Sequence, residues 1–349
     1  MTGVKRTEKV KSKQKNIRIM NRMLAVVVVL ILALFAVLAF LIYQQERNLD
    51  LSEAYVPETS GDYGGADIGS GRAASFAAAL CVSPEYVARE GVALSSADER
   101  GLLFNLETGE VLFAQNIYTQ SYPASITKIM TAVLTLENAD MSDVVTIVPE
   151  DLDLEEGSQM SGLAAGDRVT MEQLYHALVI YSANDAAMAI ARHVGGTVDR
   201  FVDMMNEKAA DIGMTGTHFS NPHGLHQADH YTTVYDVYLM LNYASQSQEF
   251  MSTVHMSSYQ LNVTAEDGTI TRSLYLSSTD QYLTGLRSVP DSVTVIGGKT
   301  GTTPEAGSNL AIVVQNAYGV PYMAVIMNAA NSSTLYEDMD MLLRQVNAQ

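Results

Sequence analysis

Serine, lysine and asparagine occur in three short motifs whose spacing could support nucleophilic catalysis. In the first motif, Ser125 and Lys128 are three residues apart at the start of a predicted helix over Ser125–Glu137. Residues three apart share one face of a helix, so the Lys128 amine can reach the Ser125 hydroxyl. A lysine accepts a proton only in its neutral form, which burial and a second nearby cation favour. The spacing therefore predicts a serine nucleophile with a lysine as its general base.

The other two motifs could supply that second cation and the groups that hold a substrate. Ser182-Ala183-Asn184 lies at a predicted junction between two helices, and Lys299-Thr300-Gly301 lies next to a strand-like run. Only three lysines follow residue 22, so a lysine in such a triplet is informative. Lys299 is the candidate second cation, and it could also pair with a substrate carboxylate. Gly301 would leave room for a substrate along the strand edge. There, a carbonyl of the substrate could accept a hydrogen bond from the N–H of Thr302.

The elements that must position these motifs follow from the hydrophobic periodicity. A hairpin is predicted at one end of the domain and three β-branched runs at the other, with a helix-rich segment between them. The expected strands are 101–105, 110–115, 293–296, 310–314 and 322–327, and the expected helices cover 125–137, 171–212, 233–243 and 334–346. The long helical segment is expected to break at residues 182–184 and 195–196. This order favours an antiparallel sheet assembled from both ends of the domain, with a helical insert.

The charge distribution divides the chain into an N-terminal membrane segment and an acidic remainder. Residues 1–22 carry a net charge of +7, and residues 23–43 carry no charge at all. A helix of 21 residues is about 31 Å long, which is enough to span the hydrocarbon core of a bilayer. The basic side is expected to stay in the cytoplasm, and the run is too long for an ordinary cleaved signal peptide. We therefore expect a single-pass cell-membrane protein whose catalytic domain lies outside the cytoplasm.

The segment that follows is predicted to be a linker to one large domain. Residues 44–84 are rich in Gly and Ser without a sustained period, and residues 85–349 form the predicted catalytic domain. Cys81, the only cysteine of the chain, lies in the linker, so no internal disulfide or all-cysteine metal site is expected. With a net charge of −18, the chain is not expected to bind nucleic acid. No cofactor or metal is expected.

At this point the sequence resembles a known family. The set Ser-x-x-Lys, Ser-x-Asn and Lys-Thr-Gly is that of the penicillin-binding proteins and serine β-lactamases. The longer matches are similar to the low-molecular-mass, serine-type D-alanyl-D-alanine carboxypeptidases, and they lie at 123–132, 182–187, 221–225, 230–233 and 299–307. The resemblance implies an α/β fold of the β-lactamase/transpeptidase type, here preceded by the transmembrane helix. It also implies removal of the terminal D-alanine from peptidoglycan stem peptides and inhibition by β-lactams.

The resemblance also implies a role for each motif residue. Ser125 is the acylated nucleophile, Lys128 is its general base, and Ser182 relays a proton toward the leaving amine. Asn184 holds the substrate's amide backbone, and Lys299 and Thr300 receive its terminal carboxylate. The N–H groups of Ser125 and Thr302 form the oxyanion hole, which is usually the largest catalytic contribution. Residue 302 is Thr where relatives often carry a larger side chain, so substrate preference beside the strand stays open.

Three other functions compete with this interpretation. A class A β-lactamase shares the three-motif arrangement, but its middle motif is usually Ser-Asp-Asn and it carries a Glu-x-x-Leu-Asn loop. Neither occurs here. A metallopeptidase could use His218, His223, His226 and His230, although their spacing fits no standard zinc site. A non-catalytic cell-wall binding module would not need a neutral lysine beside a serine. Arg287 could assist carboxylate binding, but no motif surrounds it, so a surface arginine is expected. The acidic run 151–156 is expected to be a solvated loop.

Overall fold

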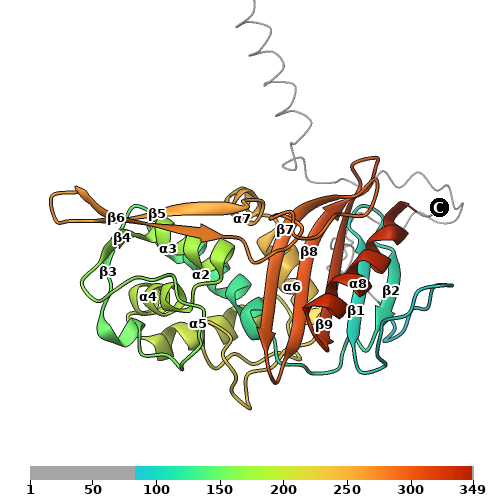
Figure 1. Ribbon diagram of the computed structural model, residues 1–349. Helices are drawn as coiled ribbons and strands as arrows, with labels where there is room; N and C mark the ends of the chain where they lie inside the picture. The colour runs from blue at the N-terminus through green and yellow to red at the C-terminus, as the bar shows by residue number, and fades with distance from the viewer. Residues whose placement is uncertain (1–82, 348–349) are drawn as a thin grey trace, which may run out of the picture. The chain divides into compact units, whose positions relative to one another are not determined.

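The computed structural model describes residues 83–347 of the chain (Figure 1). The predicted basic tail 1–22, the predicted span 23–43, Cys81 and nearly all of the linker 44–84 lie outside the described residues. Over residues 83–347, no helix is both long enough and apolar enough to cross a bilayer.

The central element is an antiparallel sheet built from both ends of the described chain, as predicted. Its five strands run in the order β2-β1-β9-β8-β7. Their bounds are β1 Arg100–Asn105, β2 Val111–Gln115, β7 Thr294–Thr303, β8 Gly307–Gln315 and β9 Pro321–Ala329. The predicted strand near residue 293 continues through the Lys-Thr-Gly motif, so the motif forms part of the edge strand β7 itself.

Alternating side chains of the sheet face two separate hydrophobic cores. Leu103, Leu310 and Ile312 pack with helix α8 (Ser332–Leu343), which lies across one face of the sheet (Figure 1). Leu102 and Ala311 belong to the larger core, which includes the helices on the other face. Period-two burial on both faces explains why these strands are strongly apolar and could be predicted from the sequence.

The helical region lies on the side of the sheet that carries the larger core. It comprises α2 Lys128–Asn138, α3 Met171–His176, a π-helical turn η3 Ala177–Tyr181, α4 Asn184–Gly195, α5 Val198–Asp211 and α6 Val234–Ala244. Breaks fall at Ser182-Ala183 and at Gly196, as predicted. Three of these helices begin after a threonine whose hydroxyl accepts a hydrogen bond from a backbone N–H of the first turn. The threonines are Thr170 before α3, Thr197 before α5 and Thr233 before α6.

A second sheet and a short helix were not predicted. The sheet has the strand order β3-β4-β5-β6, with β3 Val144–Thr146, β4 Arg168–Thr170, β5 Ser258–Thr264 and β6 Ile270–Ser277, and the helix is α7 Gln248–Val254. The strands β3 and β4 have only three residues each, whereas β5 alternates polar and apolar residues, with Tyr259, Leu261 and Val263 at every second position. Three residues are too few to show a period, but the alternation in β5 is a strand signal that our prediction missed.

The expectation for the acidic run 151–156 is wrong at its first residue. Asp151 is buried, and its carboxylate accepts two hydrogen bonds from the Arg192 guanidinium of α4, at 2.8 and 2.9 Å. A buried carboxylate is stable only when it is paired in this way. The pair fixes the start of the 152–167 loop against α4, which carries part of the candidate site.

Candidate active site

Ser125 lies in a short 3₁₀ turn, η1 (Ala124–Thr127), that leads directly into α2. The preceding residue, Ala124, has a φ of 48°, which is uncommon for a residue other than glycine. Two hydrogen bonds hold this strained backbone: Thr127 Oγ1 donates to the Ala124 carbonyl at 2.8 Å, and Asn309 Nδ2 of β8 donates to the Pro123 carbonyl at 3.1 Å. The serine is therefore held in one backbone geometry by both the helix and the sheet.

Strand β7 approaches the Ser125 turn so closely that residue 301 must be glycine. A Cβ atom at Gly301 would lie 2.8 Å from the Ser125 nitrogen and 2.9 Å from the Pro123 carbonyl oxygen. The missing side chain thus leaves room for the nucleophile's own turn, whereas we expected from the sequence that a substrate would occupy this space. The close approach brings the Lys-Thr-Gly strand next to the serine.

The Lys128 amine is enclosed by three oxygen atoms from three separate segments. Nζ lies 2.9 Å from Ser125 Oγ, 2.6 Å from Asn184 Oδ1 and 2.7 Å from the His223 carbonyl oxygen. The side chain is only 1% exposed, so water does not compete for these contacts. The structure therefore brings Ser125, Lys128 and Asn184 together as the sequence predicted.

The surroundings of Lys128 favour its neutral form. Burial lowers the pKa of Lys128 far below its usual value, the positive charge of Lys299 lowers it further, and Asp185 opposes the shift. A neutral amine has two N–H groups and one lone pair. The Asn184 and His223 oxygens can accept the two N–H groups, which leaves the lone pair for the Ser125 hydroxyl.

Ser182 and Asn184 are positioned by an irregular helix junction. Ser182 ends the π-helical turn with a φ of 66° and is 4% exposed. The Asn184 backbone N–H, at the start of α4, donates to the Gln159 carbonyl at 2.7 Å. Within residues 83–347, no hydrogen bond joins the Ser182 hydroxyl to Ser125 or Lys128, so the predicted relay role of Ser182 depends on a bound substrate.

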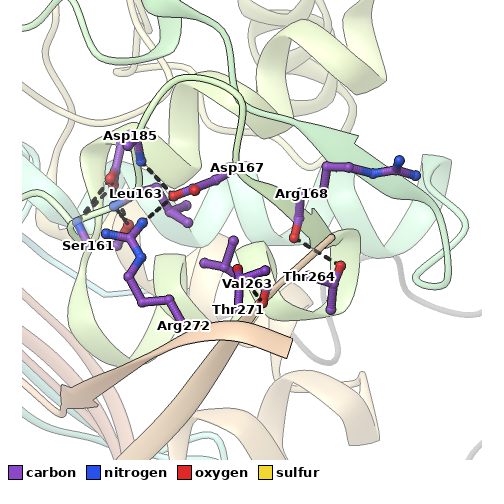
Figure 2. Close-up of polar contacts among 10 residues, drawn as sticks. Ser161, Leu163, Asp167, Arg168, Asp185, Val263, Thr264, Thr271 and Arg272 are labelled. Carbon is purple, nitrogen blue, oxygen red and sulfur yellow. Dashed lines mark hydrogen bonds and ion pairs between the residues drawn. The ribbon is translucent and has the colours of Figure 1, made fainter. Parts of the chain in front are cut away.

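The loop beside this junction is fixed by carboxylates at two points (Figure 2). Asp185, which is fully buried, accepts hydrogen bonds from the backbone N–H of Ser161 at 3.0 Å and from its hydroxyl at 2.6 Å. At the end of the loop, Asp167 pairs with Arg272 of β6, and both pairs can be followed in Figure 2. The unpredicted second sheet thus helps to hold the loop that contacts the Asn184 backbone.

The predicted substrate-binding strand lies next to this group. Lys299 is 2% exposed, and its Nζ donates to the Thr300 carbonyl at 2.9 Å. The Thr300 hydroxyl lies 2.5 Å from the Thr279 hydroxyl, and Thr302 is exposed. Burial lowers the pKa of Lys299 to about 7, whereas the negative charge of Asp280 raises it.

The four clustered histidines bond mainly to the segment that carries them and to the Ser125 turn. His230 accepts from the Ser220 N–H through Nδ1, so its Nε2–H faces Thr127 Oγ1, at 2.7 Å. Burial lowers the pKa of His230 to about 4 and that of His223 to about 3, which keeps both rings neutral at pH 7. In the part of the chain that the structure describes, no three His, Cys, Asp or Glu side chains are grouped to hold a metal ion.

Several positioning groups could not be identified from motif spacing. The His223 carbonyl belongs to the backbone, so no residue type signals it. Gly224 has a φ of 91°, and a Cβ there would lie 1.9 Å from the Ala124 carbonyl oxygen. Asn309 and Asp185 are both fully buried polar residues. Each follows another polar residue and directly precedes an apolar run, 310–314 or 186–191, a position that does not by itself mark a residue as buried, and Asp185 lies within the family match at 182–187.

Comparison with known proteins agrees with this geometry. A family model described as D-alanyl-D-alanine carboxypeptidase, peptidase S11, matches residues 90–331. The chain is 36% identical over 152 residues to the D-alanyl-D-alanine carboxypeptidase DacF of Bacillus subtilis, covering 42% of this chain and 39% of that protein. It is 30% identical over 254 residues to the D-alanyl-D-alanine carboxypeptidase DacD of Escherichia coli, covering 70% of this chain and 61% of that protein.

A solved structure has the same fold. The Streptomyces K15 DD-transpeptidase superposes with a TM-score of 0.66 at 26% sequence identity, covering 75% of this chain and all of that one. The chain belongs to the peptidase S11 family of D-alanyl-D-alanine carboxypeptidases. It spans about two fifths to three fifths of the length of the two carboxypeptidase relatives compared above.

The close approach at Gly301 yields a test of how the serine is positioned. Gly301→Ala is expected to lower the free energy of unfolding by about 1–3 kcal/mol, because the new methyl group overpacks the Ser125 turn. It is also expected to slow reaction of Ser125 with a fluorescent penicillin by about 100-fold, because a shift near 1 Å misplaces the nucleophile. Gly101→Ala in β1, which crowds Leu94 and Phe113 instead, is the control. Equal reaction rates in both variants would contradict this positioning role.

Proposed function

We propose that the chain is a membrane-anchored serine D-alanyl-D-alanine carboxypeptidase that removes the terminal D-alanine of peptidoglycan stem peptides through an acyl-enzyme on Ser125. The observation that carries the proposal is the buried Lys128 amine, 2.9 Å from Ser125 Oγ. Membership of the carboxypeptidase family supports the substrate class.

Acylation begins when Ser125 Oγ attacks the carbonyl carbon of the penultimate D-alanine. The hydroxyl proton passes to the lone pair of neutral Lys128, and the carbonyl oxygen becomes an oxyanion. The backbone N–H groups of Ser125 and Thr302 donate to that oxyanion, and the proximity of Gly301 to the Ser125 nitrogen supports this pairing. The C–N bond then breaks and leaves an ester on Ser125.

The leaving D-alanine must gain a proton and be held by its carboxylate. The proton that Lys128 took reaches the departing amine through the Ser182 hydroxyl. Lys299 and Thr300 hold the terminal carboxylate, since a buried ammonium beside a hydroxyl suits that anion. Asn184 Oδ1 already bonds to Lys128, so its Nδ2 is the group that donates to the substrate's amide carbonyl.

Deacylation distinguishes the natural substrate from a β-lactam. When D-alanine departs, it leaves space in which a water molecule can attack the ester. The amine of an opened β-lactam stays tethered to the acyl group and blocks this approach. The proposed enzyme is therefore inhibited by penicillin, and class A β-lactamase activity is the alternative to be tested.

The deciding experiment compares the unmodified protein with Ser125→Ala, using fluorescent penicillin and a peptide ending in D-Ala-D-Ala. We expect one covalent label per chain, slow release of that label, and release of D-alanine from the peptide. Ser125→Ala is expected to lose both activities, because it removes the hydroxyl that contacts the Lys128 amine. Ser121→Ala, which removes the buried hydroxyl oxygen of a partly exposed serine four residues earlier, is the matched control and is expected to retain both.

Three outcomes would contradict this function. Rapid, multiple-turnover hydrolysis of penicillin without D-alanine release would identify a β-lactamase instead. Peptide cleavage that survives Ser125→Ala and is lost with EDTA would favour the histidine cluster. A protein that binds cell walls but neither reacts with penicillin nor releases D-alanine would be a binding module.

The proposed anchor gives a separate prediction about topology. Because Cys81 is the only cysteine and follows the predicted span, a membrane-impermeant maleimide should label it in intact, wall-stripped cells. In the matched variant Cys81→Ser with Ser12→Cys, the thiol precedes the span and should be labelled only after lysis. Labelling of Cys81 only after lysis, or labelling of the thiol introduced at position 12 before lysis, would contradict the proposed orientation.

A further inference from the structure

We propose that Asp280 is a positioning residue that supplies the buried negative charge for Lys299, so that Lys299 can hold the substrate's terminal carboxylate as an ammonium ion. This inference rests on the proposed function. It concerns a residue that none of the three motifs contains, in the loop that follows β6.

Asp280 and Lys299 are both almost completely removed from water. Each side chain belongs to a residue that is only 2% exposed. Burial of a charged group without a partner is costly, and lysines respond by losing their proton. Lys299 donates one hydrogen bond, to the uncharged Thr300 carbonyl, so its charge needs another source of stabilisation.

The chain places Asp280 beside the Lys-Thr-Gly strand. The Thr279 and Thr300 hydroxyls lie 2.5 Å apart, which joins the residue before Asp280 to the residue after Lys299. Asp280 Oδ1 accepts from the Tyr282 N–H at 2.9 Å and from the Tyr336 hydroxyl at 3.4 Å. Oδ2 is buried without a hydrogen-bond partner, so the carboxylate has an unused negative oxygen in this environment.

The charged groups around this pair explain why Asp280 is the one that acts on Lys299. Lys128 is also close, and it disfavours a second positive charge when it is protonated. Asp280 acts in the opposite direction, because its negative charge raises the pKa of Lys299. Asp340 of α8 also lies nearby, but it accepts hydrogen bonds from the Tyr282 hydroxyl and from Arg287, so its charge is already paired.

This network also includes Arg287, for which the sequence predicted a surface position. Its guanidinium pairs with Asp340 at 2.6 Å, and the Arg287 backbone N–H donates to the Gln281 carbonyl at 3.0 Å. The pair closes the loop 280–287 against α8. Arg287 thus fixes the loop that carries Asp280, because its guanidinium pairs with Asp340 of α8.

The substitution Asp280→Asn tests the charge alone. Asparagine keeps an oxygen that can accept from the Tyr282 N–H, but it removes the negative charge. In the full chain, kcat/KM for a peptide ending in D-Ala-D-Ala is expected to fall as pH rises through the pKa of Lys299, about 7 in the unmodified protein. Asp280→Asn is expected to lower that alkaline pKa by about one unit, so that kcat/KM at pH 8 falls about tenfold. The loss is expected mainly in KM, because the carboxylate-binding cation is what changes.

Asp340→Asn is the matched control. It removes a carboxylate from the same network and weakens the Arg287 contact, but it leaves the charge of Asp280. Its alkaline pKa is expected to match that of the unmodified protein, even if its melting temperature is lower. An equal shift of the alkaline pKa in both variants would show a structural effect of the loop and overturn the proposal.

A measurement without substitutions keeps the proposal testable if Asp280→Asn does not fold. Burial raises the pKa of Asp280, whereas its hydrogen bonds and the positive charge of Lys299 lower it. Carbon-13 NMR of aspartate and lysine side chains in the full chain is expected to show Asp280 ionised at pH 7, with Lys299 losing its proton at or above that pH. A protonated Asp280 at pH 7 would overturn the inference. Absence of both D-alanine release and penicillin labelling in the unmodified protein would instead overturn the proposed function.

Discussion

The arrangement of the site depends on one buried amine and the three oxygens around it. Lys128 Nζ contacts the serine of the turn that leads into its own helix, the asparagine at the start of α4, and a backbone carbonyl of the 221–225 loop. Removal from water makes the ammonium form costly, and the positive charge of Lys299 adds to that cost. The same burial that gives the amine its basic lone pair also requires that the two N–H groups find acceptors. The Asn184 side chain and the His223 carbonyl accept these two hydrogen bonds. The basicity of Lys128 therefore depends on how the segments that carry these two residues pack against α2.

The backbone around the serine shows what this close packing requires. Glycine occurs at 224 and 301 because a Cβ at either position would collide with residues 123–127. Ala124 and Ser182 adopt left-handed backbone conformations on the two sides of the site. Such conformations persist only where surrounding contacts hold them. Thr127 and Asn309 provide these contacts near Ser125, and the Gln159 and Asp185 contacts provide them near Asn184.

The sequence was sufficient to predict the main sheet, most helices and the grouping of Ser125, Lys128, Asn184 and Lys299. Those predictions worked because apolar periodicity marks strands that are buried on both faces, and because residues three apart must share a helix face. The strands β3 and β4 escaped prediction because three residues show no period, whereas β5 was missed although Tyr259, Leu261 and Val263 alternate with polar residues. Asp185 and Asp280 escaped it for a different reason: a buried carboxylate looks like any surface carboxylate until the fold shows what encloses it. The roles of Ser182, Thr300 and Thr302 remain predictions that require a bound substrate to test.

The most direct test of this account is the pKa of Lys128 itself. In protein labelled with carbon-13 lysine, the Lys128 signal can be assigned by its absence in Lys128→Arg and followed as the pH is changed. The account predicts that Lys128 is a neutral amine at pH 7, with a pKa well below that of an exposed lysine. A Lys128 that remains an ammonium ion at pH 9 could not accept the Ser125 proton, and this result would contradict the account.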